Sequence, residues 1–418
     1  MNQPALAALE VEPILRAGAN GPMLQLKPGG RAGAIPLRSA QSGQVTSGLV
    51  VRPRFGWAGV GQVLAETGWH ASPEFLSLPM VPGSGREIPP WVLAGPVLAR
   101  LAELLASLRR GYKLKEETLT KPRGRILWNE YLRSSLSHGR WHQLPCQYPD
   151  LGLDPELRGN IRWALERIRR DLVVVGRQDN VAVLLANQAL RLIELLKDVL
   201  PRSPHPARLH RLMDSARLFG EALYRGVEAL GWVVEERGMG GGQEQDGLAW
   251  QLPLARLWEN YAEAVIRREA ALSGGVVKVG RLGETVFPLH WSDPSHRSLG
   301  HLVPDIVVRK GSEVRIVDAK YKAHLAELDE AGWRRFTEDA KESHRADIHQ
   351  VLAYAALYDA KTINATLVYP LRSGTWNALV ARGKDRSRAD LFSGGRKVCV
   401  ELRGLPFGCP SGSERSTS

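Results

Sequence analysis

The fold of the C-terminal part of the chain is decided by two apolar stretches that carry acidic residues, Leu302-Val303-Pro304-Asp305-Ile306-Val307 and Val314-Arg315-Ile316-Val317-Asp318-Ala319-Lys320. Lys310-Gly311-Ser312 lies between them and has the composition of a tight turn. We therefore expect an antiparallel hairpin with strands over residues 305–309 and 314–318. Because an antiparallel hairpin brings its open ends together, Asp305 and Asp318 are expected to lie side by side.

The two acids and the lysine that follows them form a pattern that suits phosphodiester hydrolysis. Adjacent carboxylates repel each other unless a cation lies between them, and oxygen ligands of this kind suit Mg²⁺ or Mn²⁺. Asp305 and Asp318 are therefore candidate metal ligands, and the backbone carbonyl of Ala319 is a further one. Lys320 lies two residues beyond Asp318, so both side chains fall on one face of the strand. A metal activates a bound water, while the Lys320 ammonium orients that water and offsets charge on the phosphate oxygens.

A surface hairpin with ordinary salt bridges is the alternative interpretation, because a single Asp-x-Lys triplet usually has that role. The apolar residues of both strands favour a buried hairpin instead. Acids at the adjoining ends of buried strands indicate a functional site. The apolar residues are Val303, Ile306, Val307, Val308, Val314, Ile316 and Val317.

Two predicted helices contribute three further candidate site residues. Gln350 and Tyr354 are four residues apart on a helix expected over residues 346–357, so they share one face of it. Glu259 lies on a helix expected over residues 252–271 and can turn a third carboxylate towards the metal. A solvated helix residue is the alternative for Glu259.

Taken in order, these segments resemble the PD-(D/E)xK nuclease superfamily and, more closely, the McrC-type nuclease subunits of McrBC restriction systems. The resemblance implies that Asp305 and Asp318 are metal ligands and that Lys320 is the catalytic lysine. It also implies that Gln350 and Tyr354 lie beside the site. The segments that carry it are Leu302-Val303-Pro304-Asp305-Ile306-Val307, Ile316-Val317-Asp318-Ala319-Lys320-Tyr321-Lys322 and Asp347-Ile348-His349-Gln350-Val351-Leu352-Ala353-Tyr354-Ala355.

The resemblance is looser towards the N-terminus. Glu259 matches the acid on the helix that leads into the nuclease strands, and Lys121-Pro122-Arg123-Gly124-Arg125-Ile126 is similar to the middle region of such proteins. Where they usually carry a segment close to DTPENR before a helix, this chain has Asp179-Asn180-Val181-Ala182-Val183, which is a departure from the pattern.

The resemblance implies a mixed α/β fold, with a restriction-endonuclease-like core in which helices flank a central mixed sheet. It implies a DNA endonuclease subunit of a restriction and antiviral defence system that acts on DNA, including modified DNA. Such subunits work with a separate AAA+ NTPase of the McrB type, and residues 1 to about 150 would dock onto it. The chain contains no GxxxxGK[ST] loop, in agreement with that division. A double-strand break needs two nuclease sites, so a dimer or a multimeric complex is expected.

Length and composition set broader limits. With 418 residues, the chain is expected to form two or three domains. The three cysteines form no CxxC pair, which argues against a disulfide framework and a cysteine zinc site. No stretch approaches about 18 uninterrupted apolar residues and no secretory signal is evident, so a cytoplasmic protein without a membrane span is expected. The formal net charge of +12 favours polyanionic partners, although Arg-rich genomes also encode basic proteins without them.

Composition along the chain predicts four segments. Residues 1–95 are rich in Gly, Pro and short apolar runs, and we expect a β-rich domain there with Gly59-Val60-Gly61-Gln62-Val63 as one strand. Residues 96–237 are expected to be mainly helical. Residues 248–405 are expected to form the nuclease domain, and 406–418 a solvated tail. The expected helices of the middle segment cover residues 91–110, 155–172, 181–200 and 206–230.

The boundary before the nuclease domain is placed in the glycine-rich residues 238–247, which form either a linker or a loop inside one domain. Two alternative functions also stay open. One is a stand-alone PD-(D/E)xK repair or RNA nuclease, and the other is a non-catalytic DNA-binding subunit that keeps the fold. His344 and His349 are weaker candidates for binding metal or phosphate, with a structural role as the alternative. No GxSxG motif supports a serine hydrolase.

Overall fold

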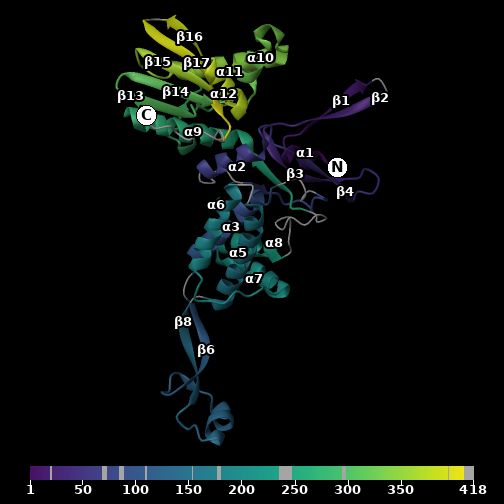
Figure 1. Ribbon diagram of the computed structural model, residues 1–418, viewed down its shortest axis with the longest axis vertical. Coiled ribbons are helices and arrows are strands. Elements are labelled where there is room, and N and C mark those ends of the chain that lie inside the picture. The colour runs from purple at the N-terminus through teal and green to yellow at the C-terminus, as the bar shows by residue number, and fades with distance from the viewer. Residues whose placement is uncertain are drawn as a thin grey trace. The chain divides into compact units, whose positions relative to one another are not determined.

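The computed structural model forms two compact units, one made of residues 1–92 and 242–418 and the other of residues 93–241 (Figure 1). None of the helices in the described part has the length and hydropathy that a membrane crossing requires. The residues that the structure describes are 1–18, 21–67, 73–83, 89–108, 111–152, 154–176, 180–234, 247–293, 298–393 and 395–408.

A six-stranded mixed sheet is the centre of the first unit. The strands β14, β15 and β17 run parallel to one another, and the remaining neighbours pair antiparallel. Helices lie on both faces, so the expected mixed sheet flanked by helices is confirmed. In spatial order the strands are β10 (Val276–Val279), β13 (Ile306–Lys310), β14 (Glu313–Ala319), β15 (Thr362–Leu371), β17 (Arg396–Pro406) and β16 (Arg386–Ser393). The helices are α9 (Leu254–Ser273), α10 (His324–Ala331), α11 (Glu338–Ala356) and α12 (Ser373–Ala381).

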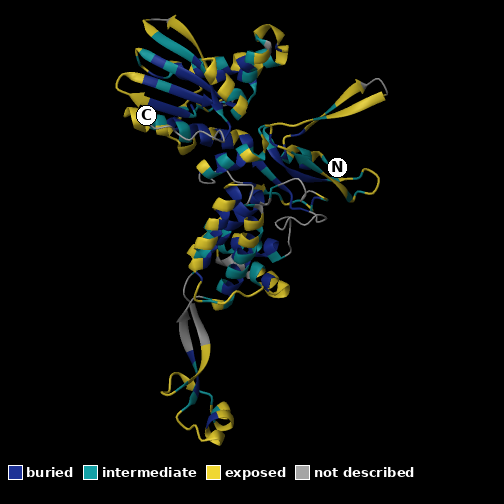
Figure 2. Cartoon of the chain, viewed as in Figure 1, coloured by how far each residue is buried: buried dark blue, intermediate teal, exposed yellow. Residues whose placement is uncertain are grey.

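Alternation along the central strands separates the two faces of this sheet. Ile316 on β14 and Leu367 on β15 belong to a buried apolar cluster that also contains Val351 of α11. Arg315, one residue earlier on β14, instead bonds to Glu269 of α9 on the opposite face. Figure 2 shows these central strands as largely buried. Two features near the C-terminus were not expected from the sequence: the β16–β17 pair, and the burial of Phe407, which the sequence placed in a solvated tail.

Residues 1–92 belong to the same compact unit as the six-stranded sheet and do not form a separate domain over 1–95. The strand β9, which comes after the glycine-rich segment, pairs with both β3 and β5 and draws this part against the rest of the unit. Of the expected boundary at 238–247, all but Gly247 lies outside the described residues. The N-terminal elements and β9 are α1 (Gln3–Ala8), β1 (Glu12–Gly18), β2 (Gly21–Lys27), β3 (Arg31–Arg38), β4 (Val45–Val51), α2 (Gly56–Glu66), β5 (Glu74–Phe75) and β9 (Trp250–Pro253).

The strand expected over residues 59–63 is wrong, because these residues belong to helix α2. Val60, Val63 and Leu64 are all buried, and their spacing of three and four residues fits a helix that buries one side. Gly59 allows a close approach here, since a Cβ atom at this position would lie 2.7 Å from the backbone oxygen of Phe407.

The second unit is mainly helical, as expected from the sequence. The single helix expected over 206–230 is instead two helices separated by Gly220, whose φ of 125° no helix accommodates. A three-stranded antiparallel sheet between α3 and α5 was not predicted. The helices are α3 (Pro90–Ser107), α4 (Trp128–Glu130), α5 (Pro155–Val175), α6 (Asn180–Glu194), α7 (Pro206–Phe219) and α8 (Glu221–Val234), and the strands are β6 (Gly111–Leu119), β7 (Arg125–Ile126) and β8 (Leu144–Gly152).

Gly59→Ala should destabilise the protein, although alanine is the better helix former. The new methyl group meets backbone that cannot move independently, and overpacking of this kind costs on the order of 1–3 kcal/mol. The matched control is Gly374→Ala in α12, where no atom lies within 4 Å of the added Cβ and stability should be unchanged or slightly higher. Urea denaturation of both variants checks this. Equal stability of the two would show that α2 does not pack closely on Phe407.

Candidate active site

The β13–β14 hairpin brings the two candidate metal ligands together. Ile306 pairs with Val317, so the next residues outward, Asp305 and Asp318, stand opposite each other on one face of the hairpin. The backbone N–H of Ala319 donates to Asp305 Oδ2 at 2.8 Å, which fixes the orientation of that carboxyl group. Asp318 is buried, with only 1% of its surface exposed.

Lys320 is held by groups from both the hairpin and helix α11. Its Nζ lies 2.7 Å from Asp318 Oδ2 and donates to Gln350 Oε1 at 2.8 Å. Gln350 Nε2 in turn donates to the hydroxyl of Tyr354 at 2.9 Å, as their spacing of one helical turn allows. The structure thus brings four of the six expected side chains, Asp318, Lys320, Gln350 and Tyr354, into one chain of polar contacts.

The electrostatics of the site are dominated by burial of like charges. Burial, followed by the charge of Asp318, raises the pKa of the Asp305 carboxyl to about 8. Burial alone would lower the pKa of Lys320, but the carboxylate of Asp318 outweighs it and the net shift is upward. Lys320 is therefore an ammonium at neutral pH, while Asp305 is largely protonated until a positive charge approaches it.

Glu259 lies on α9 and is more exposed than the two aspartates. Desolvation, followed by the charge of Asp318, raises the pKa of its carboxyl group, and its own charge contributes to the raised pKa of Asp305. The three carboxyl groups therefore interact electrostatically. The exposure of Glu259 fits the alternative of a solvated helix residue, and its role as a third metal ligand stays a prediction.

Within the described ranges, no three side chains of the His, Cys, Asp and Glu types form a ready-made metal cluster. Two observations nevertheless fit a hard cation at the hairpin. Asp318 Oδ2 is buried and accepts no hydrogen bond of regular geometry, although the Lys320 ammonium is close. Asp305 carries a carboxyl group that burial and like charge keep protonated. Both would gain from Mg²⁺ or Mn²⁺, with the Ala319 carbonyl and Glu259 as further candidate ligands.

A second cation–carboxylate pair beside the site was missed in the sequence. Lys322 Nζ lies 2.7 and 2.9 Å from the two carboxylate oxygens of Asp347, and it also donates to Ser343 Oγ at 2.9 Å. Asp347 precedes Gln350 by three residues on α11, so the two share one helix face. This spacing could have indicated from the sequence that Asp347 lies beside the site. Lys322 is partly exposed, whereas Asp347 is buried.

The two candidate histidines have different surroundings. His344 is buried among aromatic rings, with Tyr369 and His324 both within 6.3 Å between ring centroids, and burial lowers its pKa. These contacts favour the structural alternative for His344. His349 lies exposed on α11.

Aromatic packing connects the N-terminal residues to the segment that follows β14. Phe55, just before α2, lies 5.6 Å from the ring of Tyr321 and stacks on Phe407 at 5.0 Å. Tyr321 separates the two lysines Lys320 and Lys322 in the sequence. The position of the chain just after β14 therefore depends on residues about 270 positions earlier, because the rings of Phe55 and Tyr321 pack directly together.

Residues 93–370 match the model of a family described as McrBC 5-methylcytosine restriction system component. The chain belongs to this family. The match confirms the resemblance to McrBC systems that the hairpin and α11 motifs indicated. It includes all six site residues and the whole helical unit, and it leaves out residues 1–92 and the β16–β17 pair.

Comparison with solved structures gives weaker similarities to members of McrBC assemblies. A chain in a refined half-complex from the tetradecameric assembly of Thermococcus gammatolerans McrB AAA+ hexamers with bound McrC has 16% identity and a TM-score of 0.38, over 95% of this chain and 82% of that chain. A chain of the Thermococcus gammatolerans McrBC complex has 13% identity and a TM-score of 0.28, over 59% and 68%. No curated protein matches the chain. The family assignment rests on the family model alone.

Asp305→Asn should stabilise the metal-free McrBC family member at alkaline pH. A raised pKa in the folded state means that folding binds a proton between the ordinary carboxyl pKa and about 8, so wild-type stability falls as pH rises through this window. Asparagine keeps the acceptor for the Ala319 N–H and carries no charge. Melting temperatures in EDTA should favour the variant at pH 8.5 and converge with wild type near pH 4.

The control for this pH profile is Asp359→Asn, since the Asp359 side chain is 96% exposed whereas Asp305 is partly buried. Its melting temperature should track that of the wild type across the same pH range. An Asp305→Asn profile that also tracks the wild type would show that Asp305 titrates as an ordinary surface carboxyl group.

Proposed function

We propose that this chain is a metal-dependent DNA endonuclease subunit of a McrBC-type restriction system. The observation that carries the proposal is the pair of opposed acids, Asp305 and Asp318, with the ammonium of Lys320 held beside them by Gln350. Family membership supports the restriction role. The net charge of +12 supports a polyanionic substrate.

The residues of the site would have separate roles in phosphodiester hydrolysis. Mg²⁺ or Mn²⁺, when bound, supplies a Lewis acid and lowers the pKa of its water. Asp305 and Asp318 would hold it, with the Ala319 carbonyl and Glu259 completing the oxygen set. Lys320 has a raised pKa and stays charged, so it can donate to the attacking water or to a phosphate oxygen on which negative charge develops.

Gln350 and Tyr354 act through Lys320. Gln350 accepts from the ammonium and donates to the tyrosine hydroxyl, so the lysine side chain has one preferred position and loses little freedom when substrate binds. Burial raises the pKa of Tyr354, although the hydrogen bond that it accepts from Gln350 acts in the opposite direction. A positioned ammonium stabilises charge more effectively than a mobile one because it needs no reorganisation during the reaction.

We further propose a separate AAA+ NTPase of the McrB type as partner. Membership of the McrBC family supports a second component, and the chain itself carries no phosphate-binding GxxxxGK[ST] loop. Nucleotide hydrolysis would then occur on the partner, and the nuclease site on this chain would cut DNA when the two are assembled.

The decisive measurement is DNA cleavage with Mg²⁺ or Mn²⁺, with and without the NTPase partner and nucleotide. Asp318→Ala and Lys320→Ala should each lower the cleavage rate by roughly 10²-fold or more, as expected for removal of a metal ligand or of a charge-stabilising donor. DNA binding, measured in Ca²⁺, should persist in both variants.

Matched controls are Asp359→Ala and Lys310→Ala, which remove the same side-chain types from exposed positions of the same unit. Both should cut like the wild type. If Asp318→Ala and Lys320→Ala also cut normally, the hairpin is structural. If no protein cuts under any condition while DNA still binds, the chain is a non-catalytic DNA-binding subunit. Cleavage that needs neither partner nor nucleotide would favour a stand-alone nuclease.

A further inference from the structure

A second polar site lies on the face of the six-stranded sheet opposite the catalytic acids. On β14, Asp318 shares the face of Ile316, whereas Arg315 points to the other side, where it pairs in register with Asn364 of β15. Asn364 in turn is level with Cys399 of β17. These side chains border a cavity of about 260 Å³, which is lined by Arg315, Asn364, Arg386, Arg388, Cys399 and Glu401.

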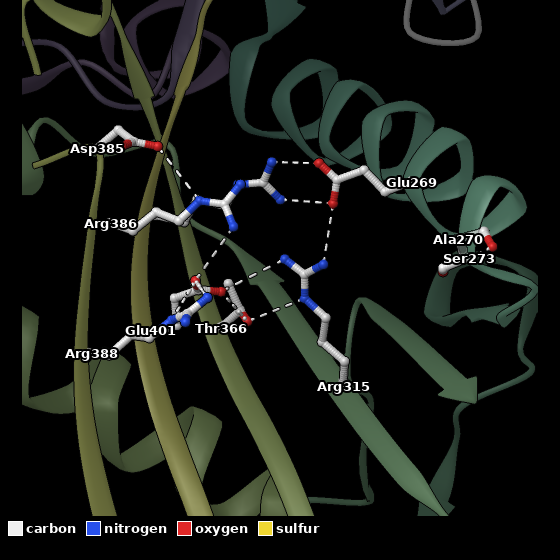
Figure 3. Close-up of polar contacts among 10 residues, drawn as sticks. Glu269, Ala270, Ser273, Arg315, Thr366, Asp385, Arg386, Arg388 and Glu401 are labelled. Atoms are coloured by element: carbon white, nitrogen blue, oxygen red, sulfur yellow. Dashed lines mark hydrogen bonds and ion pairs between the residues drawn. The ribbon is translucent and has the colours of Figure 1, made fainter. Parts of the chain in front are cut away.

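Three guanidinium groups of this pocket converge on one buried carboxylate (Figure 3). Arg388 donates to Glu401 Oε1 from Nη2 and Nε at 2.9 and 3.1 Å, and Arg386 Nη1 lies 3.9 Å from the same oxygen. Arg315 Nη2 lies 3.7 Å from Glu401 Oε2, which also accepts from the hydroxyl of Thr366 at 3.2 Å. A single carboxylate with two oxygens cannot satisfy the donors of three guanidinium groups, each of which carries five N–H bonds.

The groups around the pocket leave it with an excess of positive charge. Its lining contains three arginines and one glutamate. Behind the lining, Glu269 of α9 accepts from both Arg315 and the buried Arg403, so it is already shared between two cations. The Nε of Arg403 is buried without a hydrogen-bond partner. Burial and the charge of Arg403 lower the pKa of Arg315, as expected where cations are crowded together.

Two further acids lie near the pocket without lining it. Asp385 is 3.5 Å from Arg386 Nε, and Asp390 forms an ion pair with Lys397 at 3.0 Å. Asp390 is matched by Lys397, which does not line the pocket, whereas Asp385 offsets part of the charge of Arg386, which does. Arg315, Arg386, Arg388 and Arg403 still exceed Glu401, Glu269 and Asp385 by one positive charge, four against three.

Arginine forks suit tetrahedral oxyanions, because two parallel N–H groups match two phosphate oxygens. The Arg386 and Arg388 side chains lie on the edge strand β16 and are 43% and 61% exposed, so a ligand can reach them from solvent. The Asn364 amide adds a neutral donor. We propose that this pocket binds a phosphate group, supplied either by the DNA backbone or by free phosphate. The proposal does not depend on nuclease activity, since its test needs no metal.

The test compares the full-length double variant Arg386→Gln/Arg388→Gln with Arg382→Gln/Arg396→Gln. The second pair removes the same charge from arginines of similar exposure, 50% and 44%, that pair with Asp329 and Asp359 instead. Calorimetric titration with inorganic phosphate in EDTA should show at least a tenfold loss of affinity in the pocket variant and no loss in the control. Melting temperatures of both establish that they are folded.

A second variant distinguishes loss of phosphate binding from loss of the fold. Arg388→Lys keeps a positive charge beside Glu401 but cannot present two parallel N–H donors, so the protein should fold normally and bind phosphate more weakly. Wild-type phosphate affinity in both Arg388→Lys and the double variant would overturn the proposal.

A parallel measurement with a short DNA duplex decides the source of the phosphate. Binding of the duplex in EDTA is monitored by fluorescence anisotropy. If the pocket holds the DNA backbone, the double variant should lose more DNA affinity than the charge-matched control, and inorganic phosphate should compete with the duplex. If it holds free phosphate, both variants should bind DNA equally while only the pocket variant loses phosphate. If neither probe distinguishes the two variants, the arginines are structural and the pocket is not a ligand site.

Discussion

The main constraint on this structure is the close approach of two carboxyl groups, which lie opposite each other at the open end of the β13–β14 hairpin. Register, and not side-chain flexibility, places them there, because the pairing of Ile306 with Val317 leaves Asp305 and Asp318 level. In a buried setting this costs free energy unless a proton or a cation offsets it. The Lys320 ammonium and the Ala319 N–H offset part of this cost, but burial and the charge of Asp318 still raise the pKa of Asp305.

Such a strained arrangement persists only if the scaffold around it is stiff. The carbonyl of Val368 on β15 shows how this is achieved, because it accepts from the Lys320 backbone N–H at 2.9 Å and from Trp258 Nε1 at 3.1 Å. One oxygen thereby joins the Lys320 segment, the central strand β15 and α9. Phe407 packs against both Trp258 and Tyr321, so the same region is also clamped by aromatic rings from three parts of the chain.

The local part of this site could be predicted from the sequence, and the long-range part could not. Alternating apolar residues around Gly311 define the hairpin, and the spacing of Gln350 and Tyr354 places them on one helix face. The contact of Phe55 with Tyr321 and the pairing of β9 with β3 link residues more than 200 positions apart, and no local pattern encodes them. The same holds for the arginine pocket, whose members meet only through strand order. Residues 59–63 of helix α2 were mistaken for a strand because glycine is uncommon in helices, although the buried residues of α2 have a helical spacing.

Strand alternation also explains why one sheet can hold acids and arginines without the two neutralising each other. Arg315 and Asp318 lie three residues apart on β14 and therefore point to opposite faces. Had both faced α11, the guanidinium would compete with a metal for the aspartate oxygens. On the α9 side, Glu269 and Glu401 engage the arginines, and Asp318 interacts with Lys320 alone among basic side chains within 4 Å in the described residues. The sheet thus separates the two groups, and the arginines on the α9 side do not pair with Asp318.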